Sequence, residues 1–362
     1  MIAYYVSPVP LGCHDGRMTD RQDAPSGEDR AGKGGQWLLI ETFTWPEDGV
    51  SIVNWGGRPR AFLPVKTALK GSSIARIDRA ITTVAETREP YSESNQGYRV
   101  EAVPHVVGGR LHGIQYWSGH DGDAVPERPL VAAWRVDFTT KTALGSPEWA
   151  EMADLPPEER GQAASLATVF AQVTTDHRES VALKRIVAPQ AGETNQGFWT
   201  IKRRDGTEWQ SHWSHRTVEE SIGGETHLVG LGLSQRVQTQ PDSEPEPFVL
   251  LEHRLIEASS TPGEYQAIVD LDSLTLVRWR HGTTPPDRIA WRRIATEPEP
   301  AVHPDDRPVM LAMANGLSKS STTGSLRVRG VDGEWVRISA RADLVPVDRN
   351  VTAALVRFTI ES

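Results

Sequence analysis

The sequence predicts an α+β protein with three tandem modules, each an antiparallel sheet flanked by helices. At 362 residues the chain is too long for one small core. In each third of the chain, stretches with helical spacing of apolar residues lie beside stretches that alternate as strands do. One strand-and-turn pattern of the middle third returns in the last third. Together these observations favour repeated sheet-and-helix units.

Composition excludes several classes of protein. Hydrophobic residues make up 38% and charged residues 24%, as in soluble globular proteins. The 39 basic and 48 acidic residues give a net charge of −9, which argues against general nucleic-acid binding. No apolar run suggests a membrane span, and residues 1–12 make a poor signal peptide, so we expect a cytoplasmic protein. One cysteine, Cys13, excludes an internal disulfide framework and a multi-thiolate metal site.

The first module is expected at 36–120, after a disordered tail at 1–35 in which Met18 is the expected natural start. Trp37–Phe43 is strand-like, and Val50–Val53 is its expected partner. A helical face and a hairpin around two glycines follow: Ile74, Ile77, Ile81 and Val84, then Tyr98–Val107 and Leu111–Trp117 around Gly108 and Gly109.

The second module is expected at 128–237. It begins with the strand Val131–Phe138, and Ser146 and Pro147 start a short helix. Apolar residues on predicted helical faces are Leu166, Val169, Phe170 and Val173, then Val181 and Ile186. Phe198–Arg203 and Trp209–His215 form a hairpin around Asp205 and Gly206, and Leu228–Leu233 is the final strand. Residues 238–247, with three prolines and three acids, are the expected linker.

The third module is expected at 248–362. His303–Arg307, with the sequence HPDDR, has the acids and the following Pro308 typical of a helix start. Helical spacing then relates Val309, Met310, Met313 and Leu317, with Gly316 and Gly324 as breaks. Alternating residues on either side of Asp332 and Gly333 predict a hairpin, and Ala353–Ile360 is the last strand.

The second and third modules are related by a predicted duplication. Val136–Leu144 (VDFTTKTAL) aligns without gaps on Val269–Val277 (VDLDSLTLV). The Asp205 turn and the Asp332 turn follow in the same order, at nearly the same separation. Two markers in register make an internal repeat the natural explanation.

These residues carry a resemblance to a known family. The HPDDR helix start, the helix ending near a glycine and the strand–DG–Trp–strand hairpin resemble PAS sensor domains. Residues 36–362 as a whole resemble an actinobacterial family of stand-alone proteins with three PAS- and GAF-type modules. The segments that carry this wider resemblance are WLLIETF, the helix PVKTALKGSSIARIDRAITTVAET, the strand RLHGIQYWSG and the following PERP. The resemblance implies a sensory or signalling role without a catalytic output module. It leaves open whether modules one and three are PAS or GAF.

Candidate ligand-binding residues come from tryptophans in the second module. Trp199, Trp209 and Trp213 lie at alternating positions of two predicted strands, where they could stack on a flat ligand or simply pack the core. The cofactor stays unknown. LOV-type flavin chemistry and covalent bilin attachment are excluded from modules two and three because they contain no cysteine, which leaves a noncovalent flavin, haem or small metabolite.

Metal and catalytic motifs are missing from the sequence. His212 and His215 point to opposite faces of one predicted strand, so they cannot chelate a metal as a local pair. His303 is better explained as a helix-entry residue than as a haem ligand. There is no nucleophile elbow, Walker loop, zinc-protease or kinase motif. We therefore expect a non-enzymatic sensor with a ligand or protein partner and a homodimer as one arrangement. The alternatives are an interaction scaffold with filled pockets and, third, an enzyme of unknown type.

Overall fold

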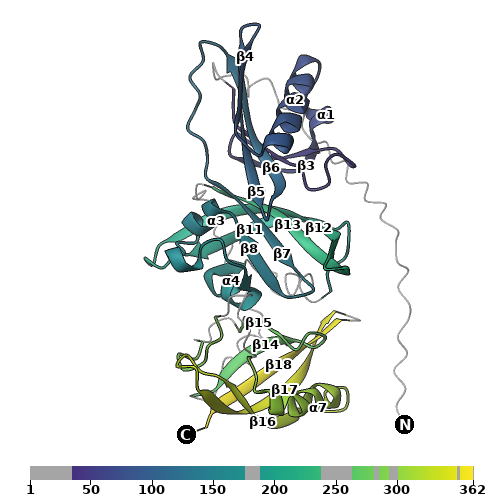
Figure 1. Cartoon of the computed structure of the whole chain (residues 1–362), viewed down its shortest axis with the longest axis vertical. Coiled ribbons are helices and arrows are strands. Elements are labelled where there is room, and N and C mark those ends of the chain that lie inside the picture. Colours follow the sequence, from purple (N-terminus) through teal and green to yellow (C-terminus); the bar gives the residue numbers. More distant parts are fainter. Residues whose placement is uncertain are drawn as a thin grey trace, which may run out of the picture.

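The computed structural model describes residues 35–175, 188–237, 263–280, 285–292, 301–348 and 351–361. The expectations for the tail, for Val181 and Ile186 and for the linker at 238–247 lie outside these residues. Three antiparallel sheets follow one another along the longest axis of the molecule, in the order of the sequence (Figure 1).

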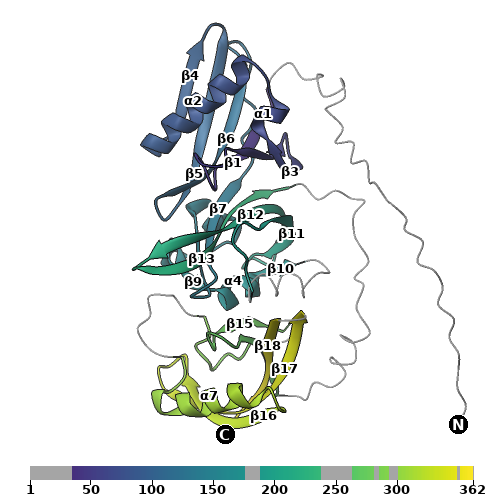
Figure 2. The same cartoon turned by 90° about the vertical axis from the view of Figure 1, so that its right-hand side faces the viewer.

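The first sheet has six strands in the order β3-β2-β1-β6-β5-β4. They are β1 Leu38–Glu41, β2 Ser51–Trp55, β3 Arg58–Pro64, β4 Tyr91–Asn95, β5 Tyr98–Val107 and β6 Arg110–His120. Between β3 and β4 come α1 Val65–Ala68 and α2 Ser72–Thr87. Helix α2 lies across one face of the sheet (Figure 2) and buries Ile77, Ala80, Ile81 and Val84, at the spacing of one helical face.

The second sheet has seven strands in the order β10-β11-β12-β13-β7-β8-β9. They are β7 Val131–Asp137, β8 Thr142–Gly145, β9 Ala164–Ser165, β10 Val173–Thr175, β11 Thr194–Lys202, β12 Glu208–Ile222 and β13 Glu225–Arg236. Its helices are α3 Pro147–Met152, the 3₁₀ turn η2 Pro157–Glu159 and α4 Leu166–Gln172.

Two expectations for this module were wrong in detail. Val173 does not continue the helical face of α4 but opens β10, where it pairs with Ile201 of β11. Strand β12 is much longer than the predicted Trp209–His215. It continues to Ile222, because its polar second half pairs with β13 as far as the Gly223–Gly224 turn, and polar strand ends carry little periodic signal.

The third sheet has five described strands in the order β15-β14-β18-β17-β16. They are β14 Tyr265–Asp270, β15 Leu276–Trp279, β16 Thr322–Arg329, β17 Trp335–Asp348 and β18 Val351–Ile360. The predicted HPDDR helix start is a 3₁₀ turn, η3 Pro304–Asp306, followed by α7 Arg307–Gly316. Gly324 is not a break but lies inside β16, where a side chain would come within 2.6 Å of Met313 Sδ on α7.

The three sheets share one topology. Five strands run β2-β1-β6-β5-β4 in the first sheet, β8-β7-β13-β12-β11 in the second and β15-β14-β18-β17-β16 in the third. In each module the helices that the structure describes are inserted between the second and third of these strands along the chain. The prediction of an α+β protein with three antiparallel sheet modules is therefore confirmed.

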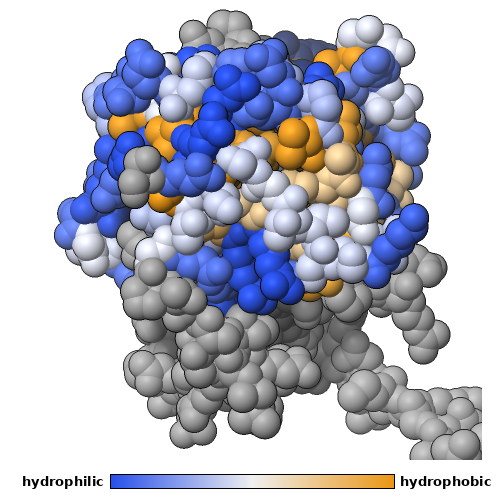
Figure 3. Space-filling view, turned by 90° about the horizontal axis from the view of Figure 1, so that it is seen from below, coloured by the Kyte–Doolittle hydropathy of each residue, from blue (hydrophilic) through white to orange (hydrophobic). Residues whose placement is uncertain are grey.

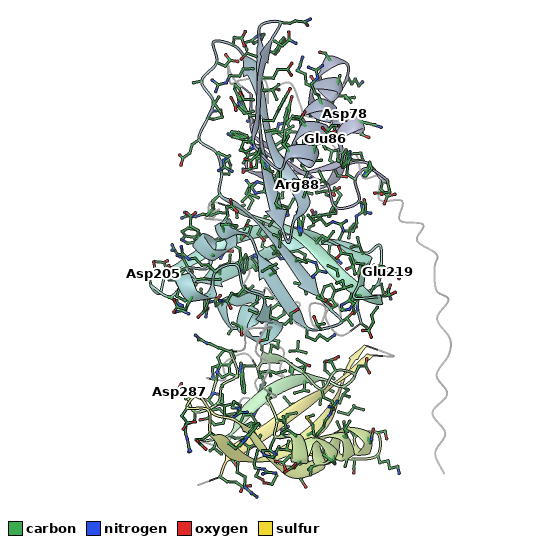
Figure 4. All side chains as sticks on the ribbon, viewed as in Figure 1. Asp78, Glu86, Arg88, Asp205, Glu219 and Asp287 are labelled. Atoms are coloured by element: carbon green, nitrogen blue, oxygen red, sulfur yellow. The ribbon has the colours of Figure 1, made fainter. Side chains whose placement is uncertain are left out.

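The repeated sequences form the same turns in space. Asp137 accepts hydrogen bonds from the backbone N–H groups of Thr139 and Thr140, and Asp270 accepts one from Ser273 N–H. Further along, Gly206 and Gly333 have φ angles of 82° and 84° in the two hairpin turns. The turn of the first hairpin, between β11 and β12, contains Asp205, which lies at the outer tip of the second module (Figure 4).

The first two sheets pack on each other through their remaining faces. All four residues of β1 are buried, because Leu38 and Ile40 face α2 while Leu39 faces the second sheet. On β7, Val131 and Ala133 face the first sheet, whereas Ala132 and Trp134 face the other way. Strands covered on both faces lose the alternation of polar and apolar residues, and these two show that pattern.

The second and third modules meet through α4 and β15. Leu166 of α4 and Phe138 share a buried cluster with Val277 of β15. At the opposite end of the third module, apolar side chains reach the surface (Figure 3), and Val309 and Leu311 of α7 are 37% and 43% exposed. Within the described residues, no helix combines the length and the apolar character that a membrane span requires.

Candidate ligand cavity in the second module

The second module encloses a cavity of about 350 Å³ between its sheet, α3 and α4. This volume is within the usual range for small-molecule sites. Six aromatic side chains contribute to its lining: Trp134, Phe138, Trp149, Phe170, Trp199 and Trp213. The first module has a smaller cavity, about 160 Å³, beside Arg88 and Arg110.

Strand register brings the tryptophans of the sheet to one face. Trp213 of β12 lies opposite Gly197 of β11, and Trp134 of β7 lies opposite Gly232 of β13. A side chain at Gly232 would come within 2.2 Å of the Trp134 ring, and one at Gly197 within 3.0 Å of the Trp213 ring. The glycines therefore leave the room in which the indoles lie flat against the neighbouring strand.

The tryptophans form a continuous aromatic wall. The ring centroid of Trp199 lies 5.5 Å from that of Trp213, 5.7 Å from that of Trp134 and 6.0 Å from that of Trp149. His215 continues the wall, with its centroid 5.5 Å from that of Trp213. These separations are typical of favourable aromatic pairs, so the wall is held by its own contacts.

The indole N–H groups differ in their partners. Trp134 Nε1–H donates to Ser234 Oγ at 2.9 Å. The Nε1 atoms of Trp199 and Trp213 are buried, and no acceptor for them lies within the described part of the chain. A buried donor without a partner costs free energy, typically about 1–3 kcal/mol. Because these two nitrogens have almost no accessible surface, they lie behind the cavity wall and out of reach of a molecule inside the cavity.

The charged residues described in the cavity lining are at least partly exposed and lie at its rim. Glu158 is exposed, and Glu159 forms an ion pair with Arg204 at 2.6 Å. Arg292, from the third module, also lines the cavity and is exposed. The rim therefore lies where the second and third modules meet.

Two of the three tryptophans predicted from sequence line the cavity. Trp199 and Trp213 do so, whereas Trp209 is absent from its lining. Instead, the guanidinium carbons of Arg203 and Arg236 lie 4.2 and 3.8 Å from the Trp209 ring centroid. A tryptophan between two arginines makes cation–π contacts at the surface of the core rather than a wall of the cavity.

The sequence prediction missed Trp134 and Trp149. Both are 8% exposed or less and line the cavity. Each of these tryptophans lies against a glycine, which is the feature that could have pointed to it. Trp134 lies against Gly232, and Trp149 lies against Gly145, where a side chain would come within 2.4 Å of the Trp149 ring. Only the fold shows the first of these pairs, because the two residues lie far apart along the chain.

The histidines considered as metal ligands lie apart. His215 lines the cavity, and His212 lies on the other face of β12, where burial lowers its pKa to about 4. His303 precedes η3, and its Nδ1 accepts from Asp305 N–H at 3.2 Å. No group of three or more potential metal ligands occurs among the residues that the structure describes.

Comparison with solved structures shows that the fold is similar to one that has already been solved. The crystal structure of an uncharacterized protein from Mycobacterium tuberculosis has a TM-score of 0.74 and 24% identity, covering 90% of this chain and 96% of that one. An RNA-binding light-oxygen-voltage receptor (TM-score 0.23, 11% identity, 64% of this chain and 95% of that one) is far less similar. The periplasmic sensory domain of the Campylobacter jejuni chemoreceptor Tlp1 is also far less similar, with a TM-score of 0.19 and 9% identity, covering 64% of this chain and 72% of that one.

No curated protein matches the chain by sequence. Two family models do match, one at each end. Residues 36–127 match the Rv3651-like N-terminal domain, and residues 249–362 match the Rv3651-like C-terminal domain. The chain therefore carries both domains of the Rv3651-like family, on either side of the module that holds the cavity.

Proposed function

We propose that this chain is a non-enzymatic, cytoplasmic sensory protein of three PAS/GAF-like modules, which binds a small ligand in its second module and passes the signal to a separate protein. The observation that carries the proposal is the largely apolar cavity walled by four tryptophans. An apolar cavity with a few polar groups is the usual form of a small-molecule site. The shared topology of the three sheets supports the PAS/GAF-like assignment.

Helix α4 supplies a route for the signal. Leu166 and Phe170 line the cavity and also belong to the cluster that packs against Val277 of the third module. A ligand that favours one position of α4 would therefore favour one arrangement of the junction with β15. This is a population shift, and its size is limited by the difference in the ligand's affinity for the two arrangements.

The test is a measurement on the full chain purified from its natural host. An ultraviolet–visible spectrum reports haem, flavin or another chromophore, and native mass spectrometry reports any bound mass. We expect a bound molecule that leaves on denaturation. A bare spectrum and a bare mass, with no shift of melting temperature across a metabolite library, would contradict ligand binding.

The second candidate is an interaction scaffold. The observation that favours it is the exposed Val309 and Leu311 on α7. Apolar side chains gathered at a surface often mark a protein contact. A scaffold would stay free of ligand in the measurement above and would retain a specific partner in pull-down experiments, which Leu311→Asp would abolish.

A further inference from the structure

We infer that the smaller cavity, in the first module, binds a small oxyanion that carries a phosphate or a carboxylate group. The cavity has a volume of about 160 Å³ and is lined by Thr42, Trp45, Ala85, Arg88, Arg110 and Leu111. This is the room of roughly five water molecules. The site lies outside the second module, so the inference goes beyond the proposed function and does not depend on it.

The end of α2 and the turn between β5 and β6 bring the two arginines of this cavity together. Arg88 is the C-cap of α2, at the end of the helix that faces the second module (Figure 4). Its Nε–H donates to Gly109 O, in the turn, at 3.3 Å. Arg110 is the next residue and opens β6. Both guanidinium groups therefore belong to the wall of one small cavity.

Both guanidinium groups can be reached by an ion and have N–H groups to offer it. Arg88 is exposed, and the side chain of Arg110 is 39% exposed. In the described structure Arg110 donates to Glu220 Oε1 and to Phe43 O, each at 2.6 Å, and Arg88 donates to two backbone carbonyls. A guanidinium has five N–H groups, so donors remain on both side chains.

The charge around the cavity favours an anion. Glu220 does not neutralise both arginines of the cavity, because its Oε2 accepts from Arg135 at 2.8 Å while its Oε1 accepts from Arg110. Glu86 and Glu89, which flank Arg88 in the sequence, are exposed, and solvent and salt screen exposed charges.

The carbonyl groups at the end of α2 do not repel an anion strongly. The C-terminus of a helix carries a partial negative charge on its free carbonyls. Here Val84 O accepts from the backbone N–H of Arg88, and Ala85 O accepts from its guanidinium. The arginine thus compensates the helix end and still lines the cavity.

The chemistry of the site matches an oxyanion. The planar fork of a guanidinium fits two oxygens of a carboxylate or a phosphate. Arg110 is already held by Glu220 and Phe43, which lowers the cost of ordering it around a ligand. Leu111 is buried, and Trp45 and Ala85 are half-buried, so these apolar walls keep water from part of the site and strengthen a charged hydrogen bond.

The test is equilibrium dialysis of the full chain against radiolabelled phosphate and, separately, radiolabelled acetate, with chloride keeping the ionic strength constant. We expect saturable binding of about one ion per chain, and the tighter of the two ions identifies the oxyanion group. Arg88→Gln should weaken its binding at least about ten-fold, because a charge-assisted hydrogen bond is lost. The variant adds no backbone strain, since both residues are L side chains at the same φ of 61°.

Arg79→Gln is the matched control. It removes the same charge from α2, at a side chain that pairs with Glu93 at 2.8 Å, and should change the dissociation constant by less than roughly two-fold. Lack of saturable binding for both ions, or equal weakening by the two variants, would overturn the inference.

A second variant keeps the test decisive if Arg88→Gln does not fold. Arg88→Lys retains the charge but loses the fork, and it should weaken binding at least about three-fold. An unchanged dissociation constant in Arg88→Lys would then overturn the inference. None of these results bears on the cavity of the second module, which is tested by native mass spectrometry.

Discussion

Lys141 and Asp270 face each other across the junction of the second and third modules, with Nζ 3.7 Å from Oδ2. Their side chains are 5% and 2% exposed. Both belong to the repeated turn, in which Lys141 and its counterpart Leu274 have φ angles of 58° and 53°. Burial lowers the pKa of Lys141, and the nearby Asp270 opposes this effect. The two copies of the turn thus join the modules through one buried ion pair.

Replacing Lys141 by Met should destabilise the protein by about 3 kcal/mol. Removing one partner of a buried ion pair leaves the other charge uncompensated, which typically costs about 3–5 kcal/mol. We expect a loss of stability at the lower end of this range because Asp270 keeps its hydrogen bonds from Ser273. Urea unfolding followed by circular dichroism measures the change.

Lys202→Met is the matched control for this variant. Lys202 is 54% exposed, and its Nζ lies 4.0 Å from Glu208 Oε1, so its loss should cost less than about 0.5 kcal/mol. Adding Asp270→Leu to Lys141→Met should recover part of the lost stability. If the two lysine variants lower the free energy of unfolding equally, the buried ion pair stabilises the protein no more than the exposed one does.

Gly232→Ala should destabilise the second module by about 1–3 kcal/mol, the usual cost of overpacking. The new Cβ would come within 2.2 Å of the Trp134 ring, which cannot move freely because its N–H donates to Ser234. Thermal unfolding gives the measurement. Gly122→Ala is the control, since nothing lies within 4 Å of its added Cβ, and it should stay within about 0.5 kcal/mol of wild type. Similar melting temperatures for the two variants would contradict the close packing.

Stability should fall as the pH drops from about 6.5 to about 4. Burial lowers the pKa values of His105, His112 and His212 to about 4 from an ordinary value of 6.5. Between these limits the unfolded chain binds more protons than the folded chain, so acid favours unfolding, by at most about 3 kcal/mol for each histidine. Below pH 4 this contribution levels off. Denaturant titrations across the range measure it.

His112→Asn should reduce this pH dependence. His112 Nδ1 lies 3.3 Å from Gly232 O, and an asparagine amide can donate to the same carbonyl without titrating. His120→Asn, at the exposed end of the same strand, should leave the dependence unchanged. If His112→Asn retains the full wild-type slope, His112 is not one of the groups that cause it.

Val169→Phe should fill part of the cavity and weaken ligand binding at least about ten-fold, because the ligand would have to displace a buried ring. Val169 lines the cavity from α4. The same substitution at Val331, which is 66% exposed, is the control and should leave binding unchanged. The readout is the bound mass in native mass spectrometry. Undiminished binding in Val169→Phe would place the ligand elsewhere.

Features that depend on neighbours in the chain were predictable from the sequence. Helix α2 was recognised by its apolar spacing. The hairpin turns were recognised by glycines that adopt positive φ, among them Gly109 at 78° and Gly333 at 84°. Asp137 and Asp270 marked the repeated turn, because a carboxylate that accepts from nearby backbone N–H groups is a local device. Such signals lie within a few residues of one another.

The site was only partly predictable, because strand alternation assigns a residue to a face without saying what covers that face. Trp209, Trp213 and Trp199 share a face by register, yet only the last two line the cavity. Trp209 is covered by the side chains of Arg203 and Arg236 instead.

By itself, the sequence determined the α+β class, most strands, the main helices and the repeat, since these follow from backbone preferences and short-range periodicity. The tertiary structure alone decided that the first two sheets share a core, that Gly232 makes room for Trp134 and that Lys141 meets Asp270. The physical reason is that burial and pairing between distant residues depend on how whole sheets pack. Periodicity along one segment contains no information about its partner.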